Sequence, residues 1–492
     1  MISKIKRIYN QNEWLSNKYN GRIFALYLLI SLVLFYSYIY VDILEVTRLS
    51  LHYLDNLFSG LARNFYTEQI VLDSFSYVKY VEPTYEFPIY IIFAIWNLPI
   101  YILERFAGID VLNNVFCLMW VKTMVLVFVF IFIKSLTKLC RTLDFSENDT
   151  ILTVILFLTS NFLITSIIEI SEYDIISLCF VLYGIDAYIR HDHRRFVMMF
   201  ACAIPLKFFA LLIFLPLILL KEKNIWKILG NLVAVMAPIL LFRLIIPCSG
   251  QPAGLNLMDM FKGTNVGNLA LLYAIEYYAK LVVGEVYYSV VCLGILMAFC
   301  YFLELKTDED LKKYSIYVCM LSYAILFVTC YTHPYWILIL VPFIHLVIVQ
   351  NKRYIHINLV LEMVMTWGMI LAQLFEFPWC FGNAIVAGSF WSKILGSKAT
   401  YEQFNMSVLL GNIIGEEGVL KLSNGAKGMG ASVFVGCVIM FVIINLPAIR
   451  DKKMPLINNS GKLEYWVMPF RMISGVIIGI LPIIMYALYM KG

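Results

Sequence analysis

Residues 23–41 read IFALYLLISLVLFYSYIYV, an apolar run without a charged side chain, and Asp42 follows it directly. A helix crosses a bilayer with about 20 mostly apolar residues, so this run predicts a membrane span that ends at a carboxylate. Residues 1–22 before it are polar and basic and show no cleavable signal peptide, so we expect the run to remain as an anchor. We expect residues 1–22 to be the cytoplasmic N-terminus.

The same character extends along the whole chain. Of 492 residues, 61% are hydrophobic and 14% are charged, whereas soluble domains carry about 25% charged residues. This composition excludes a soluble globule, a collagen, a disulfide scaffold and a disordered chain. It predicts an all-α fold, one polytopic transmembrane helix bundle over residues 1–492 with about 12 or 13 helices. Further apolar runs lie at residues 114–133, 150–168, 175–189, 228–247, 286–303, 314–331, 334–349, 355–375, 429–449 and 467–490.

Short basic clusters separate these runs and predict the topology. Basic loops prefer the cytoplasmic side of the membrane. All of the basic clusters lie on that side only if two conditions hold. Residues 196–220, interrupted by Pro205, must form a hairpin that returns to its starting side. Residues 87–103 must form an interfacial or re-entrant helix that does not cross. The sequence thus predicts a multi-pass protein of the cell membrane.

The elaborated loops all fall on the external side in this topology. Residues 42–112 form a long first external loop with interfacial helices, and residues 378–428 form another external loop. The glycine-rich stretch 411–430 within it predicts a flexible segment. Because the cytoplasmic side carries little except basic stubs, we expect the protein to act at the extracytoplasmic membrane boundary.

The charge and the cysteines exclude several partners. The net charge is only +5 and the basic residues are dispersed, so no nucleic acid is expected to bind. The 11 cysteines lie mostly in apolar runs without a CxxC pair, which predicts buried, reduced thiols. Lys122, Glu362 and Arg471 also lie in apolar runs, and we interpret them as structural pairs without a catalytic role.

Asp42 is the predicted general base. A carboxylate just beyond the lipid edge has a raised pKa and can accept a proton near neutral pH. If the chain continues as a helix, Glu45, Arg48, His52 and Asp55 share one face with it at spacings of three and four. For His52 and Asp55, an ordinary solvated stripe with helical ion pairs is an equal alternative.

Five segments in order resemble the GT-C superfamily of integral-membrane glycosyltransferases, which use polyprenyl-phosphate-linked sugars. The resemblance covers about residues 23–350, and Asp42 stands alone where some branches carry paired acidic residues. The segments are Asp42 after the first span, EPTYEFPIY at residues 82–90, EYD at 172–174, AIPLKF at 203–208 and THPYW at 332–336.

The resemblance implies an inverting sugar transfer from a polyprenyl-phosphate donor to a cell-surface glycan or lipid acceptor, beside membrane lipid. Asp42 would be catalytic, and a cation would stabilise the leaving phosphate. The residues expected to bind substrate are Glu45, Arg48, Glu172, Asp174, Lys207, Arg243, His333 and Tyr335.

Several of these positions have a structural alternative. Lys207 is equally a snorkelling lysine at a hairpin tip, and Asp174 is equally a helix cap. Asp42 and Asp174 are candidate ligands for Mg²⁺ or Mn²⁺, although no spacing specifies a ligand set. Aromatic residues of the outer loops, Tyr85 and Trp336 among them, have side chains that can stack on sugar faces, but most are interpreted as an interfacial belt.

Two other classes of protein share this topology. A lipid-linked polysaccharide polymerase or ligase would depend on external Arg63, Arg243 and His333 rather than on Asp42. A multi-pass transporter or flippase would carry charged residues along a path at mid-membrane and two matched halves. The sequence shows few charged residues within its apolar runs and no matched halves.

Overall fold

The computed structural model describes most of the chain. Its described residues are 14, 17–66, 70–72, 80–83, 85–245, 282–283, 286–330, 332–375, 386, 388–396, 406–450 and 466–491. Within these ranges, the strands are two short antiparallel pairs, β1 (Ile70–Val71) with β2 (Tyr80–Val81) and β3 (Val282–Val283) with β4 (Val286–Tyr287). All other regular structure there is helical, so the predicted all-α bundle is confirmed.

Helices follow one another along both halves of the described chain. The first half holds α3 (Lys18–Ser37), α4 (Val41–Phe58), η1 (Ala62–Asn64), α5 (Phe87–Ala107), α6 (Val115–Thr142), α7 (Glu147–Leu158), α8 (Asn161–Leu163), η2 (Ile164–Glu169), α9 (Ile175–Ile189), α10 (His193–Leu206), η3 (Phe208–Ala210), α11 (Leu211–Lys221) and α12 (Ile225–Ile245). The second half holds α15 (Tyr288–Phe302), α16 (Asp308–Thr329), η4 (Pro334–Ile339), α17 (Val341–Gln350), η5 (Lys352–Tyr354), α18 (Ile355–Gln373), α21 (Phe390–Leu395), α22 (Met406–Ile444), α23 (Pro447–Arg450) and α24 (Val467–Lys491).

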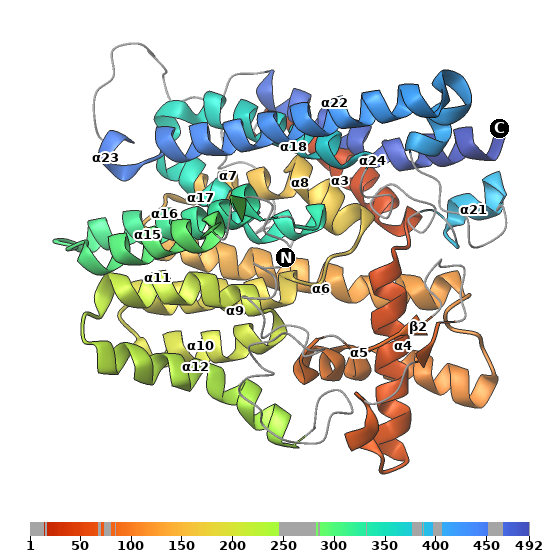
Figure 1. Cartoon of the computed structure of the whole chain (residues 1–492), viewed down its shortest axis with the longest axis horizontal. Helices are drawn as coiled ribbons and strands as arrows, with labels where there is room; N and C mark the ends of the chain where they lie inside the picture. The colour runs from red at the N-terminus through yellow and green to blue at the C-terminus, as the bar shows by residue number, and fades with distance from the viewer. Residues whose placement is uncertain are drawn as a thin grey trace.

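Eight of the described helices are long and apolar enough to cross a membrane, or nine if the bent pair α7 with α8–η2 is one span. Four shorter apolar helices accompany them, and the predicted number of 12 or 13 is reached only when these are included. In Figure 1, α18, α22 and α24 lie in one layer and α9 to α12 lie in another. The apolar helices fit a multi-pass membrane protein.

Helices α4 and α5 form much of the predicted first external loop. The α5 helix qualifies as a span by length and composition, so these criteria do not separate it from the other spans. The α4 helix does not qualify, and Figure 1 shows it running across the direction of α6, α11 and α22. A helix that crosses the others in this way is the geometry expected of an interfacial element.

The chain breaks between α3 and α4, where the sequence predicted one continuous span to residue 41. Tyr38 and Tyr40 are both extended, with ψ of 144° and 154°. Lys122 on α6 donates hydrogen bonds to the carbonyl oxygens of Phe35 and Tyr38, which the end of α3 leaves without helical partners. The break is therefore held from α6, and it places Asp42 in the first turn of α4.

The predicted hairpin at Pro205 is present. The α10 helix ends at Leu206, Lys207 is extended with φ of −153° and ψ of 116°, and η3 and α11 then lead back. At the far end of α11, Lys221 donates to the carbonyl of Tyr188 and lies 3.4 Å from His191, just before α10 begins. Lys207 thus occupies the tip of a hairpin whose two ends meet.

The prediction of a flexible loop over residues 411–430 is wrong. This stretch belongs to α22, which is helical except at Gly415 with φ of 71°. A Cβ atom on Gly430 would lie 2.4 Å from the backbone nitrogen of Ala372 and 2.6 Å from the carbonyl of Gly368. Glycine there permits close packing of α22 on α18, a common use of small residues between membrane helices.

Candidate functional site

Helix α4 presents a polar stripe, as its spacing predicted. Its other described residues from Val41 to Asn56 are buried, and the stripe alone is half-buried. The residues of the stripe are Asp42, Glu45, Arg48, His52 and Asp55.

The far half of this stripe is engaged by α5. Arg105 forms an ion pair with Asp55, and the hydroxyl of Tyr101 donates to the same carboxylate at 2.9 Å. Arg48 Nη1 lies 3.7 Å from Glu104 Oε1. The predicted alternative of ion pairs therefore describes this half, but the partners come from another helix.

The ammonium group of Lys207 is buried, whereas a snorkelling lysine would place it in water. Its side chain is only 5% exposed, and Nζ lies 2.8 Å from Oδ1 of Asp174. Three aromatic rings surround the ammonium group at 5.1, 5.2 and 5.8 Å from Nζ to centroid, those of Tyr85, Trp336 and Phe209. Rings at these distances stabilise a cation through their π faces, so Lys207 is a buried, charged group.

Asp174 supplies the negative partner and does not cap a helix. It stands at the N-cap position of α9, yet its side chain makes no capping hydrogen bond, so that alternative is wrong. Its backbone N–H donates to Glu172 Oε1 at 3.2 Å. Among the described residues, neither carboxylate oxygen of Asp174 accepts a hydrogen bond of good geometry. Buried polar atoms are normally satisfied, so this carboxylate retains capacity for a further donor.

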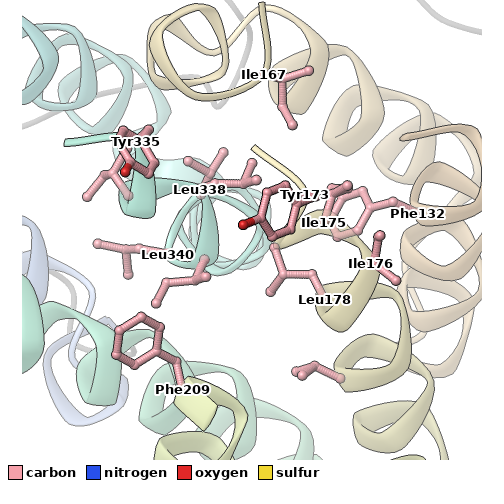
Figure 2. Packing of buried hydrophobic residues seen from close by; sticks show 14 of the residues in the cluster. Phe132, Ile167, Tyr173, Ile175, Ile176, Leu178, Phe209, Tyr335, Leu338 and Leu340 are labelled. Atoms are coloured by element: carbon pink, nitrogen blue, oxygen red, sulfur yellow. The ribbon is translucent and has the colours of Figure 1, made fainter. Parts of the chain in front are cut away.

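Tyr335 joins these groups to Asp42. Its hydroxyl donates a hydrogen bond to the Asp42 carboxylate, and its ring packs against Tyr40 at 5.7 Å between centroids. His333 stacks on Tyr335 at 5.3 Å and meets Trp336 at 4.8 Å. In Figure 2, Tyr335 from η4 and Tyr173 from the turn before α9 lie on either side of Leu338.

Burial shifts the proton affinities of these groups, which lie outside the candidate spans. It raises the pKa of Asp42 to about 6, although the charge of Lys207 and the Tyr335 hydrogen bond oppose the shift. Burial, together with the charge of Asp42, raises the pKa of Glu45 to about 8. Burial and then Lys207 lower the pKa of His333 to about 4, so this imidazole is neutral at neutral pH.

The Asp42 cluster, as we name it, thus contains most of the predicted site residues. Arg48 is held by Glu104, and Arg243 lies in α12 with a side chain outside the described part of the chain. Sequence reasoning did not connect Tyr85 and Trp336 with Lys207, although their rings lie at its ammonium group and both stand in quoted motif segments. The members of the cluster are Asp42, Glu45, Glu172, Asp174, Lys207, His333 and Tyr335.

The described residues contain no group of three or more His, Cys, Asp or Glu that could hold a metal ion. Asp174, one of the two candidate ligands, faces the ammonium of Lys207 instead. A site for Mg²⁺ or Mn²⁺ at Asp42 and Asp174 stays a prediction without a ligand set.

A second charged group lies deep in the bundle, and we name it the Arg471 cluster. Arg471 on α24 pairs with Glu362 on α18, as the structural interpretation of these two residues predicted. Arg471 Nη2 also lies 2.9 Å from His345 Nε2, and Nη1 donates to Thr159 Oγ1 at 2.8 Å and to a backbone carbonyl. Ser160 Oγ donates to Glu362 at 2.6 Å.

The Arg471 cluster is centred on the bend between α7 and α8. These two segments meet at 46°, and Thr159 and Ser160 are the residues that join them. The carbonyl of Leu156, which the bend removes from the regular helical pattern, accepts from Arg471 at 2.9 Å. This cluster therefore stabilises the bend by satisfying a carbonyl oxygen that the helix leaves free. Lys122, the third residue interpreted as structural, does the same for carbonyl oxygens at the end of α3.

Comparison of the chain with protein-family models, with curated proteins and with solved structures finds no match.

Proposed function

We propose that the protein is a membrane glycosyltransferase that moves a sugar from a polyprenyl-phosphate donor to a cell-surface glycan or lipid acceptor. The observation that carries this proposal is the joint placement of a half-buried carboxylate, Asp42, and a buried cation, Lys207, next to the end of α3. A base and a cation are the two groups that transfer from a phosphoester requires. The N-terminus would be cytoplasmic and the site extracytoplasmic.

In this reaction the acceptor hydroxyl gives its proton to the Asp42 carboxylate and its oxygen bonds to the anomeric carbon. The bond from that carbon to the phosphate oxygen breaks, and its electron pair leaves with the polyprenyl phosphate. The transition state has oxocarbenium character. The positive charge of Lys207 would stabilise the growing negative charge on the phosphate, because electrostatic interactions are strong in a site of low dielectric constant.

The remaining members of the cluster support a division of roles. Because burial raises the pKa of Glu45 to about 8, it is protonated at neutral pH and would donate a hydrogen bond to a sugar or phosphate oxygen. Two carboxyl groups with separated pKa values commonly serve different roles. Neutral His333 would donate or accept one hydrogen bond, and Asp174 would hold Lys207 in place.

The direct test uses membranes that contain the full chain and a panel of labelled polyprenyl-phosphate sugars. Transfer of label and release of free polyprenyl phosphate are both scored. Asp42→Asn is expected to abolish transfer, and the matched control Asp55→Asn, on the same stripe but held by α5, is expected to retain it. Full transfer activity in the Asp42→Asn variant would contradict the proposed mechanism. Loss in His333→Ala with retention in Asp42→Asn would favour the polymerase or ligase class.

One observation favours a second candidate function, a multi-pass transporter or flippase. The Arg471 cluster places charges inside the bundle at a broken helix, and both features occur in transporters. Within this cluster, however, the Glu362 carboxylate is engaged by Arg471, His345 and Ser160. A transporter requires exchange at such a site, so Glu362→Gln would abolish substrate movement in proteoliposomes and leave any transfer chemistry at Asp42 intact.

A further inference from the structure

A cavity of about 360 Å³ lies between α16, α18 and α22, outside both charged clusters. Its volume falls within the range of roughly 300–1,000 Å³ typical of ligand pockets. Apolar side chains form most of its lining, including Phe327, Met369 and Phe434. Four polar residues complete it, and they are Thr332, Gln373, Asn424 and Lys427.

The polar residues gather at one end of the cavity. Thr332 follows the end of α16, and Gln373 is the last residue of α18. On α22, Gly430 packs against Ala372 near that same end of α18, and Phe434 packs one turn deeper, against Gly368. Asn424 and Lys427 precede Gly430 on α22, so they lie level with Gln373 or beyond it. The cavity is therefore polar at the helix ends and apolar toward the middle of the bundle.

The helix α22, which covers one side of the cavity, has an exposed apolar face. The span in α22 is only 28% buried within the protein, and Met429, Ile439 and Ile443 on it are exposed by 66, 47 and 54%. Large apolar side chains exposed on a membrane helix face acyl chains. The cavity lies beneath such a helix, and an apolar lining disfavours water.

We infer that this cavity binds an anionic phospholipid, with one acyl chain among Phe327, Met369 and Phe434 and the phosphate at Lys427. Thr332, Gln373 and Asn424 then offer hydrogen bonds to head-group oxygens. Within the described lining, Lys427 is the single cation. One cation matches the single negative charge of a phosphodiester, whereas a phosphomonoester carries nearly two charges near neutral pH.

The position of the cavity gives the bound lipid contact with the back of the Asp42 cluster. Thr332 and Pro334 line the cavity, while the alternate residues His333 and Tyr335 belong to the cluster. A lipid in the cavity therefore packs against the same short segment that donates a hydrogen bond to Asp42. The binding itself does not depend on the proposed sugar transfer.

Native mass spectrometry of the full chain in detergent micelles tests this inference. The added probes are phosphatidylglycerol, neutral phosphatidylcholine and an isoprenoid phosphate. Gly428→Phe fills the cavity, because Gly428 lines it and a Cβ atom there meets no atom within 4 Å. Gly436→Phe is the matched control on the same helix, since its Cβ also meets nothing within 4 Å and it does not line the cavity.

We expect phosphatidylglycerol to bind in preference to phosphatidylcholine and Gly428→Phe to weaken it by about tenfold or more. Lys427→Gln is expected to weaken it by about fivefold, the effect of about 1 kcal/mol per basic residue. Lys421→Gln, which alters an exposed ion pair with Glu417, is the control for charge.

Three results would overturn the inference. The first is equal retention of phosphatidylglycerol by Gly428→Phe and Gly436→Phe. The second is equal binding of phosphatidylcholine and phosphatidylglycerol to the unaltered chain. The third is a preference for the isoprenoid phosphate that Gly428→Phe removes. Lys427→Gln changes only a half-buried side chain at the cavity end, so it keeps the test decisive if Gly428→Phe does not fold.

Discussion

The Asp42 cluster and the Arg471 cluster both bury charged side chains, but they differ in how completely those side chains are paired. Arg471 and Glu362 each have several partners of good geometry, from four segments of the chain. Asp174 and Lys207 have each other and three rings, and the carboxylate oxygens of Asp174 accept no hydrogen bond of good geometry among the described residues. Asp42 and Glu45 beside them are half-buried.

This difference in pairing distinguishes a cluster that stabilises the fold from a cluster that can react with a ligand. A paired cluster contributes to a specific packing arrangement, and removal of one partner leaves an uncompensated charge. A cluster with unsatisfied atoms and partial access to solvent can exchange partners with a ligand, and shifted pKa values are frequent at such sites. The comparison predicts that mutations in the Arg471 cluster affect folding and that mutations in the Asp42 cluster affect activity.

The largest effect is expected for Asp42→Asn. The amide cannot accept the acceptor proton, so sugar transfer should fall by about 10²–10⁴-fold, while the thermal unfolding temperature in detergent stays within error of the unaltered chain. The measurement is initial rate with saturating donor, alongside an unfolding scan. A large drop in unfolding temperature with retained specific activity would reverse the roles of the two clusters.

Arg471→Met is expected to show the opposite pattern. It leaves the buried Glu362 carboxylate without the cation that balances its charge, which costs about 3–5 kcal/mol of stability. The double variant with Glu362→Leu should recover much of this loss, because no buried charge remains. Unfolding scans of both variants give the measurement, and a single variant as stable as the unaltered chain contradicts the structural role.

Thr159→Val tests the same cluster with a smaller change. It removes the oxygen that accepts from Arg471 Nη1 at 2.8 Å, and the carbonyl of Leu156 still accepts from that nitrogen. Hydrogen bonds to charged groups contribute about 1.5–3 kcal/mol, so the loss of stability should be less than for Arg471→Met. Equal losses in the two variants would show that the bend, and not the ion pair, dominates.

The pH dependence of activity should follow the Asp42 cluster alone. Asp42 acts as a base only when deprotonated, so its raised pKa of about 6 predicts activity that is present above this pH. Below about pH 6 the rate should fall by about tenfold per unit. Above about pH 8 the ionisation of Glu45 adds a second negative charge and should lower the rate again. A profile that is flat between pH 5 and 7 would exclude Asp42 as the base.

Sequence reasoning found the important residues of both clusters because each one is a charge in or beside an apolar run. Asp42, Lys207, Glu362 and Arg471 were all noticed on this ground. It could not find their other partners, because contacts such as that of Ser160 with Glu362 join residues 202 positions apart. Those contacts depend on helix packing that hydropathy does not encode.

Local rules also failed where packing overrides them. Hydropathy continued the first span through Tyr38 and Tyr40, but Lys122 on another helix stabilises a break there. Glycine density predicted a loop at residues 411–430, but Gly430 allows two helices to approach closely. In both cases the deciding atoms belong to a distant part of the chain.

Because of the break between α3 and α4, the depth of Asp42 in the membrane should depend on the thickness of the bilayer. The 20 residues of α3 span about 30 Å, which equals the hydrocarbon thickness of a typical membrane. Because α4 turns across the bundle where α3 ends, Asp42 would lie level with the limit of the acyl region in a bilayer that α3 crosses. Lipids with longer or shorter chains change that limit by several ångströms, and a helix responds by tilting. The immersion of Asp42, and with it the proton affinity of its carboxylate, should therefore follow the length of the surrounding acyl chains.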